Sequence, residues 1–272
     1  MIRRSLSSHP VRRVIPAAAL TAVAVALAAP ARAGAPFIYR GLTLPRGDVA
    51  LDLGLGIGHD DFDPGPSQSG MGMNLEIAGG VTHELELGLR TGFRFDDGGR
   101  VTQADRYGRP FDTETYGTNN GSVANPEARM RWSVARGSAV QLGLEVRAYL
   151  PIENGSRFGM MFGLPLALRA GSVRLDTGLY VPIIFTEPTT TIVSVPLHLW
   201  IQASSTLWLG PLFGLRVISQ GGSHNEYPLG FGLGTMLTRS VDFRAWFLFP
   251  DINRNEGARQ FGGGAAVQIR FE

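Results

Sequence analysis

The sequence predicts a single closed antiparallel β-barrel of about twelve strands that spans a membrane. Two observations carry this prediction: apolar and polar residues alternate along many short segments, and the connections between these segments alternate between short and long. The clearest segment is 84–95, in which Leu85, Leu87, Leu89, Phe93 and Phe95 share one parity. Successive side chains of a strand point to opposite faces, so this segment has one apolar and one charged face.

The first 33 residues predict a cleaved export signal. A basic start is followed by an apolar run at 14–29, and residues 31–33 (Ala-Arg-Ala) fit a small-residue cleavage site. The run is shorter than the ~20 residues that a spanning helix needs, which disfavours a retained anchor. The segment holds five of the 25 basic residues and no acidic one, so the remaining chain has 20 basic and 23 acidic residues. This balance gives no support to nucleic-acid binding.

Residues 34–47 contain Pro36 and Pro45 and are expected to form a periplasmic lead-in or a plug in the lumen; residues 48–272 are expected to form the barrel. Each predicted strand is close to the ~10 residues with which a tilted strand crosses a membrane. The alternating segments lie at 49–57, 71–77, 84–95, 128–134, 140–150, 158–168, 173–183, 195–201, 207–217, 229–237, 241–249 and 267–271.

The predicted connections fall into two classes, as expected for a barrel with periplasmic turns and external loops. Tight turns are predicted at 82–83, 135–138, 170–172, 203–205 and 238–240. Mostly longer loops are predicted at 59–70, 96–125, 151–156, 187–191, 220–227 and 251–258. An even strand number puts both termini in the periplasm. The loop 96–125 is the longest and would either fold inward as a constriction or meet surface partners.

A soluble all-β protein is the alternative to a membrane barrel. It would have to bury the apolar face of every strand in a core while its other faces remain charged. Exposure of such a large apolar surface to water is unfavourable, so the membrane barrel is preferred.

The signal, the alternating strands and the terminal segment 267–271 (VQIRF) resemble Gram-negative outer-membrane β-barrel proteins of the transporter or porin type. The resemblance covers the whole mature chain and implies an outer-membrane location, contact with outer-membrane lipids and insertion by the outer-membrane assembly machinery. In that class a terminal aromatic residue acts as the insertion signal, and Phe271 matches it. Glu272 follows Phe271, which departs from the pattern and would weaken recognition.

The inward parity gathers charged side chains that we expect to line the lumen and to set its selectivity. Ten arginines and seven acidic residues share this parity. The proposed selectivity residues are Arg90, Arg94, Arg129, Arg131, Arg147, Glu86, Glu127, Glu145, Arg174, Arg216 and Arg244.

Four of these arginines lie on the two strands joined by the loop 96–125, and Glu86 and Glu127 are the acidic residues expected beside them. A local excess of cations would favour small anions or acidic solutes in a narrow pore. Alternatively, Glu76 and Glu145 on the flanking strands neutralise the patch and fill the barrel with ion pairs.

Three functions remain open on this basis: a narrow passive channel for small polar, acidic or amphipathic solutes, a structural barrel without a pore, and an outer-membrane lipid hydrolase. About eight strands leave an interior filled by side chains and about sixteen leave a water channel, so the intermediate size favours a narrow channel.

An enzyme is not expected. Ser194 and His198 stand four residues apart, ~13 Å along a strand, and cannot touch. Counting back across the connection 187–191 places Tyr180 opposite His198 and Asp176 opposite Gln202.

No cofactor is expected. Asp60, Asp61 and Asp63 are candidates for a divalent cation because carboxylates suit hard ions, but they lack the spacing of a calcium loop, and a solvated acidic loop is preferred.

Overall fold

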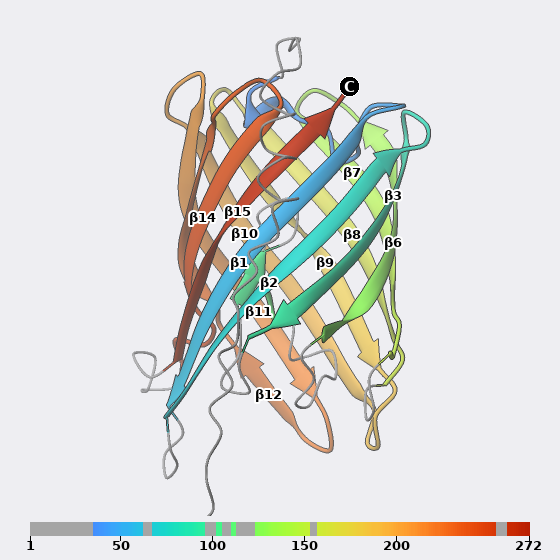
Figure 1. Cartoon of the computed structure of the whole chain (residues 1–272), viewed down its shortest axis with the longest axis vertical. Helices are drawn as coiled ribbons and strands as arrows, with labels where there is room; N and C mark the ends of the chain where they lie inside the picture. Colours follow the sequence, from blue (N-terminus) through green and yellow to red (C-terminus); the bar gives the residue numbers. More distant parts are fainter. Residues whose placement is uncertain are drawn as a thin grey trace, which may run out of the picture.

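The computed structural model describes residues 35–61, 67–95, 123–152, 157–253 and 260–272, together with two short strands at 102–104 and 110–112. Twelve of the described strands form the wall of a closed antiparallel barrel (Figure 1), which confirms the predicted fold. In order around the wall they are β1 (Val49–Asp61), β2 (Ser67–Gly80), β3 (Leu85–Arg94), β6 (Val123–Arg136), β7 (Val140–Tyr149), β8 (Gly159–Ala170), β9 (Val173–Ile184), β10 (Thr190–Gln202), β11 (Leu207–Ser219), β13 (Leu229–Met236), β14 (Val241–Phe249) and β15 (Gln260–Phe271).

The barrel closes between its first and last strands. β15 pairs with β1 from Val49↔Phe271 to Asp60↔Gln260. The closure leaves no free edge in the wall, which a membrane requires of a β-sheet because lipid cannot satisfy unpaired backbone groups. Within the described part of the chain, no helix is long and apolar enough to cross a bilayer.

Two predicted loops contain short strands. Residues 220–227 include β12 (Ser223–Glu226), which folds back along β11. The loop 96–125 includes β4 (Thr102–Ala104) and β5 (Pro110–Asp112), which pair with each other. β4 also pairs with β1 at Ile57↔Thr102. The loop therefore contacts the wall beside β1, whereas its side chains lie outside the described residues.

The two faces of the wall follow the predicted parity. Leu87 and Leu89 are 46% and 58% exposed on the outer face, whereas Glu86, which precedes Leu87, and Arg90, which follows Leu89, are 0% and 6% exposed. The same alternation runs through the other strands, for example in β7. The outer surface is therefore an apolar band and the lumen is lined by polar residues.

Short turns gather at the end of the barrel that also holds the C-terminus and the start of β1 (Figure 1). Hydroxyl side chains stabilise these turns: Thr82 Oγ1 accepts hydrogen bonds from the backbone N–H groups of Glu84 and Leu85. Ser204 Oγ does the same in the β10–β11 turn, with Leu207 N as one donor. Serine and threonine favour turns for this reason. The assignment of this end to the periplasm remains a prediction.

The predicted register between β9 and β10 is wrong. His198 lies opposite Asp176 instead of Tyr180, and Tyr180 lies opposite Ser194. The counting error comes from the connection, which spans residues 185–189 and not 187–191.

The cause is the polar run Thr189–Thr191, which was assigned to the loop although Thr190 and Thr191 begin β10. The hydroxyl of Thr186 donates to the carbonyl oxygen of Pro188 at 2.7 Å and lies 3.0 Å from Thr190 Oγ1. These bonds close the turn two residues earlier than its composition indicates.

Residues 35–47 lie inside the short-turn end of the barrel, and we call them the plug (Figure 1). The plug contains a 3-10 turn, η1 (Phe37–Tyr39), followed by an irregular segment that leads into β1. Phe37, Ile38, Leu42 and Leu44 are at most 6% exposed, although no strand contains them. These buried side chains lie within the end of the barrel, and the role of the segment remains a prediction.

Candidate functional site in the barrel lumen

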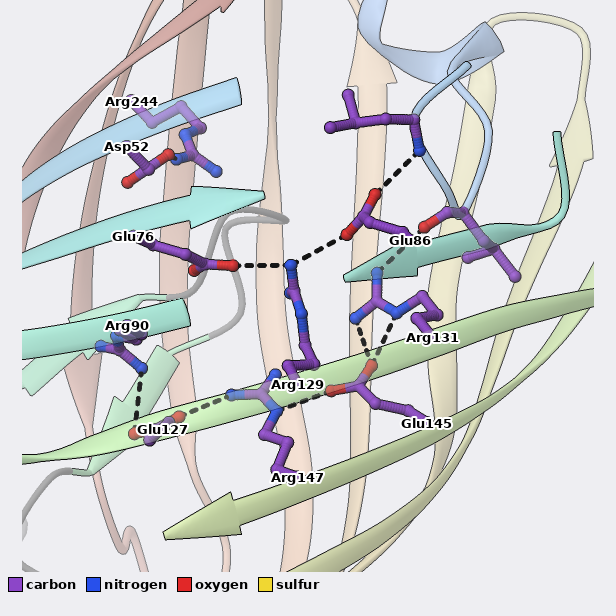
Figure 2. Close-up of polar contacts among 12 residues, drawn as sticks. Asp52, Glu76, Glu86, Arg90, Glu127, Arg129, Arg131, Glu145, Arg147 and Arg244 are labelled. Atoms are coloured by element: carbon purple, nitrogen blue, oxygen red, sulfur yellow. Dashed lines mark hydrogen bonds and ion pairs between the residues drawn. The ribbon is translucent and has the colours of Figure 1, made fainter. Parts of the chain in front are cut away.

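A chain of ion pairs runs along the inner face of four neighbouring wall strands, β2, β3, β6 and β7 (Figure 2). Arg129 Nη2 lies between Glu76 Oε1 at 2.7 Å and Glu86 Oε1 at 2.8 Å. Gly88 of β3 lies opposite Arg129 of β6, and a Cβ on Gly88 would come within 2.9 Å of Arg129 Nη2. The glycine therefore gives the guanidinium the space to reach both carboxylates.

A second chain runs from β3 to β7 (Figure 2). Arg90 Nη1 lies 3.8 Å from Glu127, whose other oxygen is 3.2 Å from Arg147 Nη1. Arg147 Nε donates to Glu145 at 2.7 Å, and Arg131 also donates to Glu145, through Nε at 2.7 Å. Arg131 and Glu145 are each 1% exposed. Side chains that line an open aqueous pore would be wet, so the lumen is filled at this level.

The eleven predicted selectivity residues all lie on the inner face of the wall. Arg94 and Arg216 are half-buried and the other nine are buried. Their role in selectivity remains a prediction.

The expected local excess of cations is largely absent. Glu86 and Glu127 are the acidic residues expected beside the arginines. In the structure, Glu76 also pairs with Arg129, and Glu145 pairs with Arg131. The alternative in which the flanking strands neutralise the patch therefore fits the geometry. Pairing depends on which side chains meet in the lumen, which parity alone does not determine.

Further ion pairs occupy the rest of the described lumen. Arg174 Nε lies 2.7 Å from Asp176 on its own strand, and Arg244 pairs with Asp52 across the closure of the barrel. Arg216 Nη1 lies 2.9 Å from Glu226 of β12, an acidic residue in a predicted loop.

The lumen wall binds the backbone of the plug. Leu44 N donates to Glu86 Oε2 at 2.8 Å, and Leu42 N donates to Gln141 Oε1 at 3.0 Å. In return, Arg131 Nη1 donates to the carbonyl oxygen of Leu42 at 3.0 Å. Glu86 and Arg131 thus belong both to the ion-pair cluster and to the contact with the plug.

Arg40 anchors the plug on the opposite wall. Its Nη2 donates to Asp242 Oδ1 at 3.0 Å and its Nη1 to Asp242 Oδ2, which also accepts from Arg270. Burial lowers the pKa of Arg40, which precedes the first strand, while the hydrogen bond and charge of Asp242 raise it. Arginine side chains are not deprotonated in proteins, so Arg40 carries its charge in this contact. A cavity of about 40 Å³ between Arg40, Phe37 and the wall has room for a few water molecules.

Phe37 inserts into an aromatic pocket that the sequence argument missed. Its ring stacks on Trp208 at 4.7 Å between centroids and 6° between planes, and meets Trp200 edge-on at 5.6 Å. Trp246 belongs to the same buried cluster. All three tryptophans have inward parity, whereas the lumen residues expected from the sequence are only the charged and polar ones of that parity. An aromatic residue at an inward position was the signal.

The remaining candidates of the sequence analysis are Asp60, Asp61, Asp63, Ser194 and His198. Among the described residues, no cluster of His, Asp and Glu could hold a metal ion. Asp60 is buried and accepts a hydrogen bond from Gln260 Nε2 at 2.7 Å, whereas Asp63 lies outside the described residues. His198 faces Asp176, but Ser194, the serine on the same face, lies opposite Tyr180 and Arg216.

No protein-family model and no curated protein matches the chain. Solved structures do match. One is an outer-membrane channel from Pseudomonas putida F1, with 12% sequence identity, a TM-score of 0.56, and coverage of 86% of this chain and 98% of that chain. Another is the NanC porin, with 7% identity, a TM-score of 0.54, and coverage of 80% and 98%.

These similarities and the closed wall define the class of protein: the chain has the fold of outer-membrane β-barrels. At these identities the likeness extends to the fold and to nothing more specific. The lumen, with its ion pairs and its plug, is the part of the chain from which a function has to be argued.

Proposed function

We propose that this protein is a narrow passive channel of the Gram-negative outer membrane, which admits small polar, acidic or amphipathic solutes when the plug leaves the lumen. The observation that carries the proposal is the plug itself. Twelve strands lie between the about eight whose own side chains fill a barrel and the about sixteen that leave a water channel. Here the short-turn end is filled by the plug, which is not one of the wall strands. Because the plug is held by hydrogen bonds to side chains, it can move without breaking the backbone pairing of the barrel.

The two similar structures are a channel and a porin by title, which is consistent with this proposal. The outer-membrane location follows from the apolar outer band together with the predicted export signal. The assembly machinery and outer-membrane lipids are the partners that this location implies.

A structural barrel without a pore is the second candidate, and the buried ion pairs favour it. A barrel that never opens gains rigidity from a filled lumen, and the wall arginines here are largely neutralised. We propose further that the protein is not an enzyme, because the serine that shares a face with His198 lies four residues along the strand.

Selectivity for anions is expected to be modest. The inward parity carries ten arginines and seven acidic residues, so a small positive excess remains after pairing. Reversal potentials under a salt gradient measure this preference, and Arg94→Gln, which removes a half-buried cation, should reduce it.

Conductance in a planar bilayer tests the channel. Wild-type protein should open rarely, and Arg40→Ala should open more often because the plug loses its ion pair with Asp242. Deletion of residues 35–44 should give the largest conductance. Arg46→Ala is the matched control, since Arg46 belongs to the same segment and is exposed.

A folded plug-deleted barrel that passes no current would reject the channel and favour the structural barrel. Folding is checked by the shift in gel mobility on boiling, so loss of conductance through misfolding is recognised.

A further inference from the structure

We propose that the lumen contains a binding site for small molecules that join an aromatic ring to a carboxylate, and that Phe37 of the plug occupies this site as an internal ligand. The inference deepens the proposed function and rests on it, because a solute enters the lumen only through a barrel that opens. It assigns a class of solute to the pocket that the plug fills.

The ring-binding part of the site is built into the wall. Trp200, Trp208 and Trp246 are between 1% and 6% exposed and lie on β10, β11 and β14. Each ring packs against a glycine of another strand of the wall. A Cβ on Gly234 would lie 2.3 Å from Trp208, and one on Gly232 would lie 2.7 Å from Trp200. The indoles therefore lie flat against the wall and leave a space into which a planar ring fits.

The same holds for Trp246, since a Cβ on Gly264 would come within 2.5 Å of its ring. Phe37 stacks in the remaining space with its plane 6° from that of Trp208. The near-parallel stack selects planar rings over saturated ones, which lack the π-face.

The polar part of the site consists of Arg174 and Arg169, whose guanidinium groups face the carbonyl groups of the plug. Arg174 Nη1 donates to the carbonyl oxygens of Phe37 at 3.4 Å and Arg40 at 2.7 Å. Arg169 Nη2 donates to the Arg40 carbonyl at 2.8 Å. When the plug leaves, these N–H groups lose their acceptors, and a buried donor without an acceptor is unfavourable. A carboxylate on the incoming solute would replace the lost carbonyl oxygens with charge-assisted hydrogen bonds.

Phe37 itself defines the shape of the solute. Its ring lies on Trp208 and its own carbonyl carbon is two carbon atoms away from the ring, with the oxygen directed to Arg174. The Arg174 guanidinium also lies 5.3 Å from the ring centroid, where a cation stabilises an aromatic ring. 3-Phenylpropanoate has the same ring and two-carbon arm and ends in a carboxylate at the position of the Phe37 carbonyl group, so it is the probe of choice.

Tryptophan fluorescence of the folded full-length protein in detergent measures binding. The chain has four tryptophans, and Trp132 is exposed on the outer face, so a Trp132→Phe background reports on the three lumen residues. In this background, Phe37→Ala empties the site, and 3-phenylpropanoate should bind more tightly to it than to the protein with Phe37.

Two analogues separate the parts of the site. 3-Cyclohexylpropanoate, which has no planar ring, should bind roughly two- to twelvefold more weakly. 3-Phenylpropan-1-ol, which has no charge, should bind roughly tenfold more weakly, and Arg174→Gln, which leaves Arg169 as the other cation, should reduce this difference.

Equal binding of the three compounds, or no binding to the emptied site, would overturn the proposal. If Phe37→Ala does not fold, Phe37→Leu and the deletion of residues 35–44 remove the ring of Phe37 in other ways. The same binding comparisons among the three compounds then apply to these variants. Binding and conductance are read independently. Ring-selective binding without conductance rejects the channel and keeps the site, whereas conductance without binding rejects the site alone.

Discussion

The charged residues of the lumen serve as packing as much as they serve as charges. Glu145 accepts from both Arg131 and Arg147, and its side chain is fully buried. Here the guanidinium and carboxylate groups of neighbouring strands satisfy one another's hydrogen bonds and fill the space beside the wall. The ion pairs therefore contribute to the single, defined arrangement of the lumen.

Neutralisation of one such carboxylate should be costly. Glu145→Gln keeps the shape of the side chain but leaves two buried guanidinium groups without their shared anion, so we expect a loss of about 3–5 kcal/mol in unfolding free energy. Urea unfolding in lipid vesicles measures it. The control is Glu84→Gln: Glu84 lies 3.4 Å from Arg136 and both side chains are about half exposed, so its loss should be about 0–1 kcal/mol. Equal effects of the two changes would contradict the structural role of Glu145.

At the scale of single residues, the sequence predicts the face of the wall on which each side chain lies and little more. The inward position of Arg131 follows from parity. Its partners do not, because they come from β7 and from the plug, and side-chain rotamers decide which carboxylate is reached. Trp208 was within reach of the same parity argument but was overlooked, since an apolar inward residue does not look like part of a polar lumen.

Among the elements, β8 to β11 contain an unusual row of residues. Pro165 of β8 lies opposite Gly178 of β9, and Pro196 of β10 lies opposite Gly214 of β11. The pairing of β9 with β10 is interrupted at this height, between Ser194↔Tyr180 and Leu197↔Thr177. Proline has no N–H group to donate to a neighbouring strand, which explains the interruption.

Gly178 is the most constrained member of this row. Its φ is 149°, a conformation that L side chains rarely adopt, and a Cβ there would lie 2.5 Å from the carbonyl oxygen of Leu164. Gly178→Ala should therefore reduce the yield of folded barrel, with a backbone strain of about 1–3 kcal/mol in addition to the clash. The folded fraction on an unboiled gel measures it. Gly222→Ala is the control, because a Cβ on Gly222 meets nothing within 4 Å. A normal yield for Gly178→Ala would show that this part of the wall relaxes easily.

The sequence predicts the existence of all twelve wall strands. It misplaces a strand boundary where polar residues adopt an extended conformation. Thr190 and Thr191 are polar, and for that reason they were placed in a loop, yet β-branched residues fit a strand well. The plug has the opposite problem. Its Pro and Gly residues predict an irregular segment, but a segment without periodicity does not distinguish a plug from a periplasmic lead-in, because that depends on acceptors and rings from distant strands.

At the scale of the whole molecule, the apolar band around the barrel should determine insertion. Leu89 is 58% exposed on the outer face, near the middle of β3. Leu89→Arg should destabilise the inserted barrel by about 2–4 kcal/mol if this position lies at the midplane. Val81 is 50% exposed in the turn before β3, so Val81→Arg should cost only about 0–1 kcal/mol. Folding equilibria in vesicles compare the two, and a larger effect at Val81 would place the membrane elsewhere along the barrel.

The last strand combines two roles, closure of the barrel and presentation of the predicted insertion signal. Phe271 pairs with Val49 and its ring is 46% exposed on the outer face, at the end of β15 where both roles meet. Deletion of Phe271 and Glu272 would remove one backbone pair as well as the ring, so it cannot separate the roles, whereas Phe271→Ala keeps the backbone. We expect Phe271→Ala to fold in detergent like the wild type but to be inserted poorly in cells and degraded in the periplasm. Phe271→Tyr, which keeps an aromatic ring, should restore insertion. Normal surface levels of Phe271→Ala would show that the closing strand is recognised by another feature, and a failure to fold in detergent would show that the ring acts through closure.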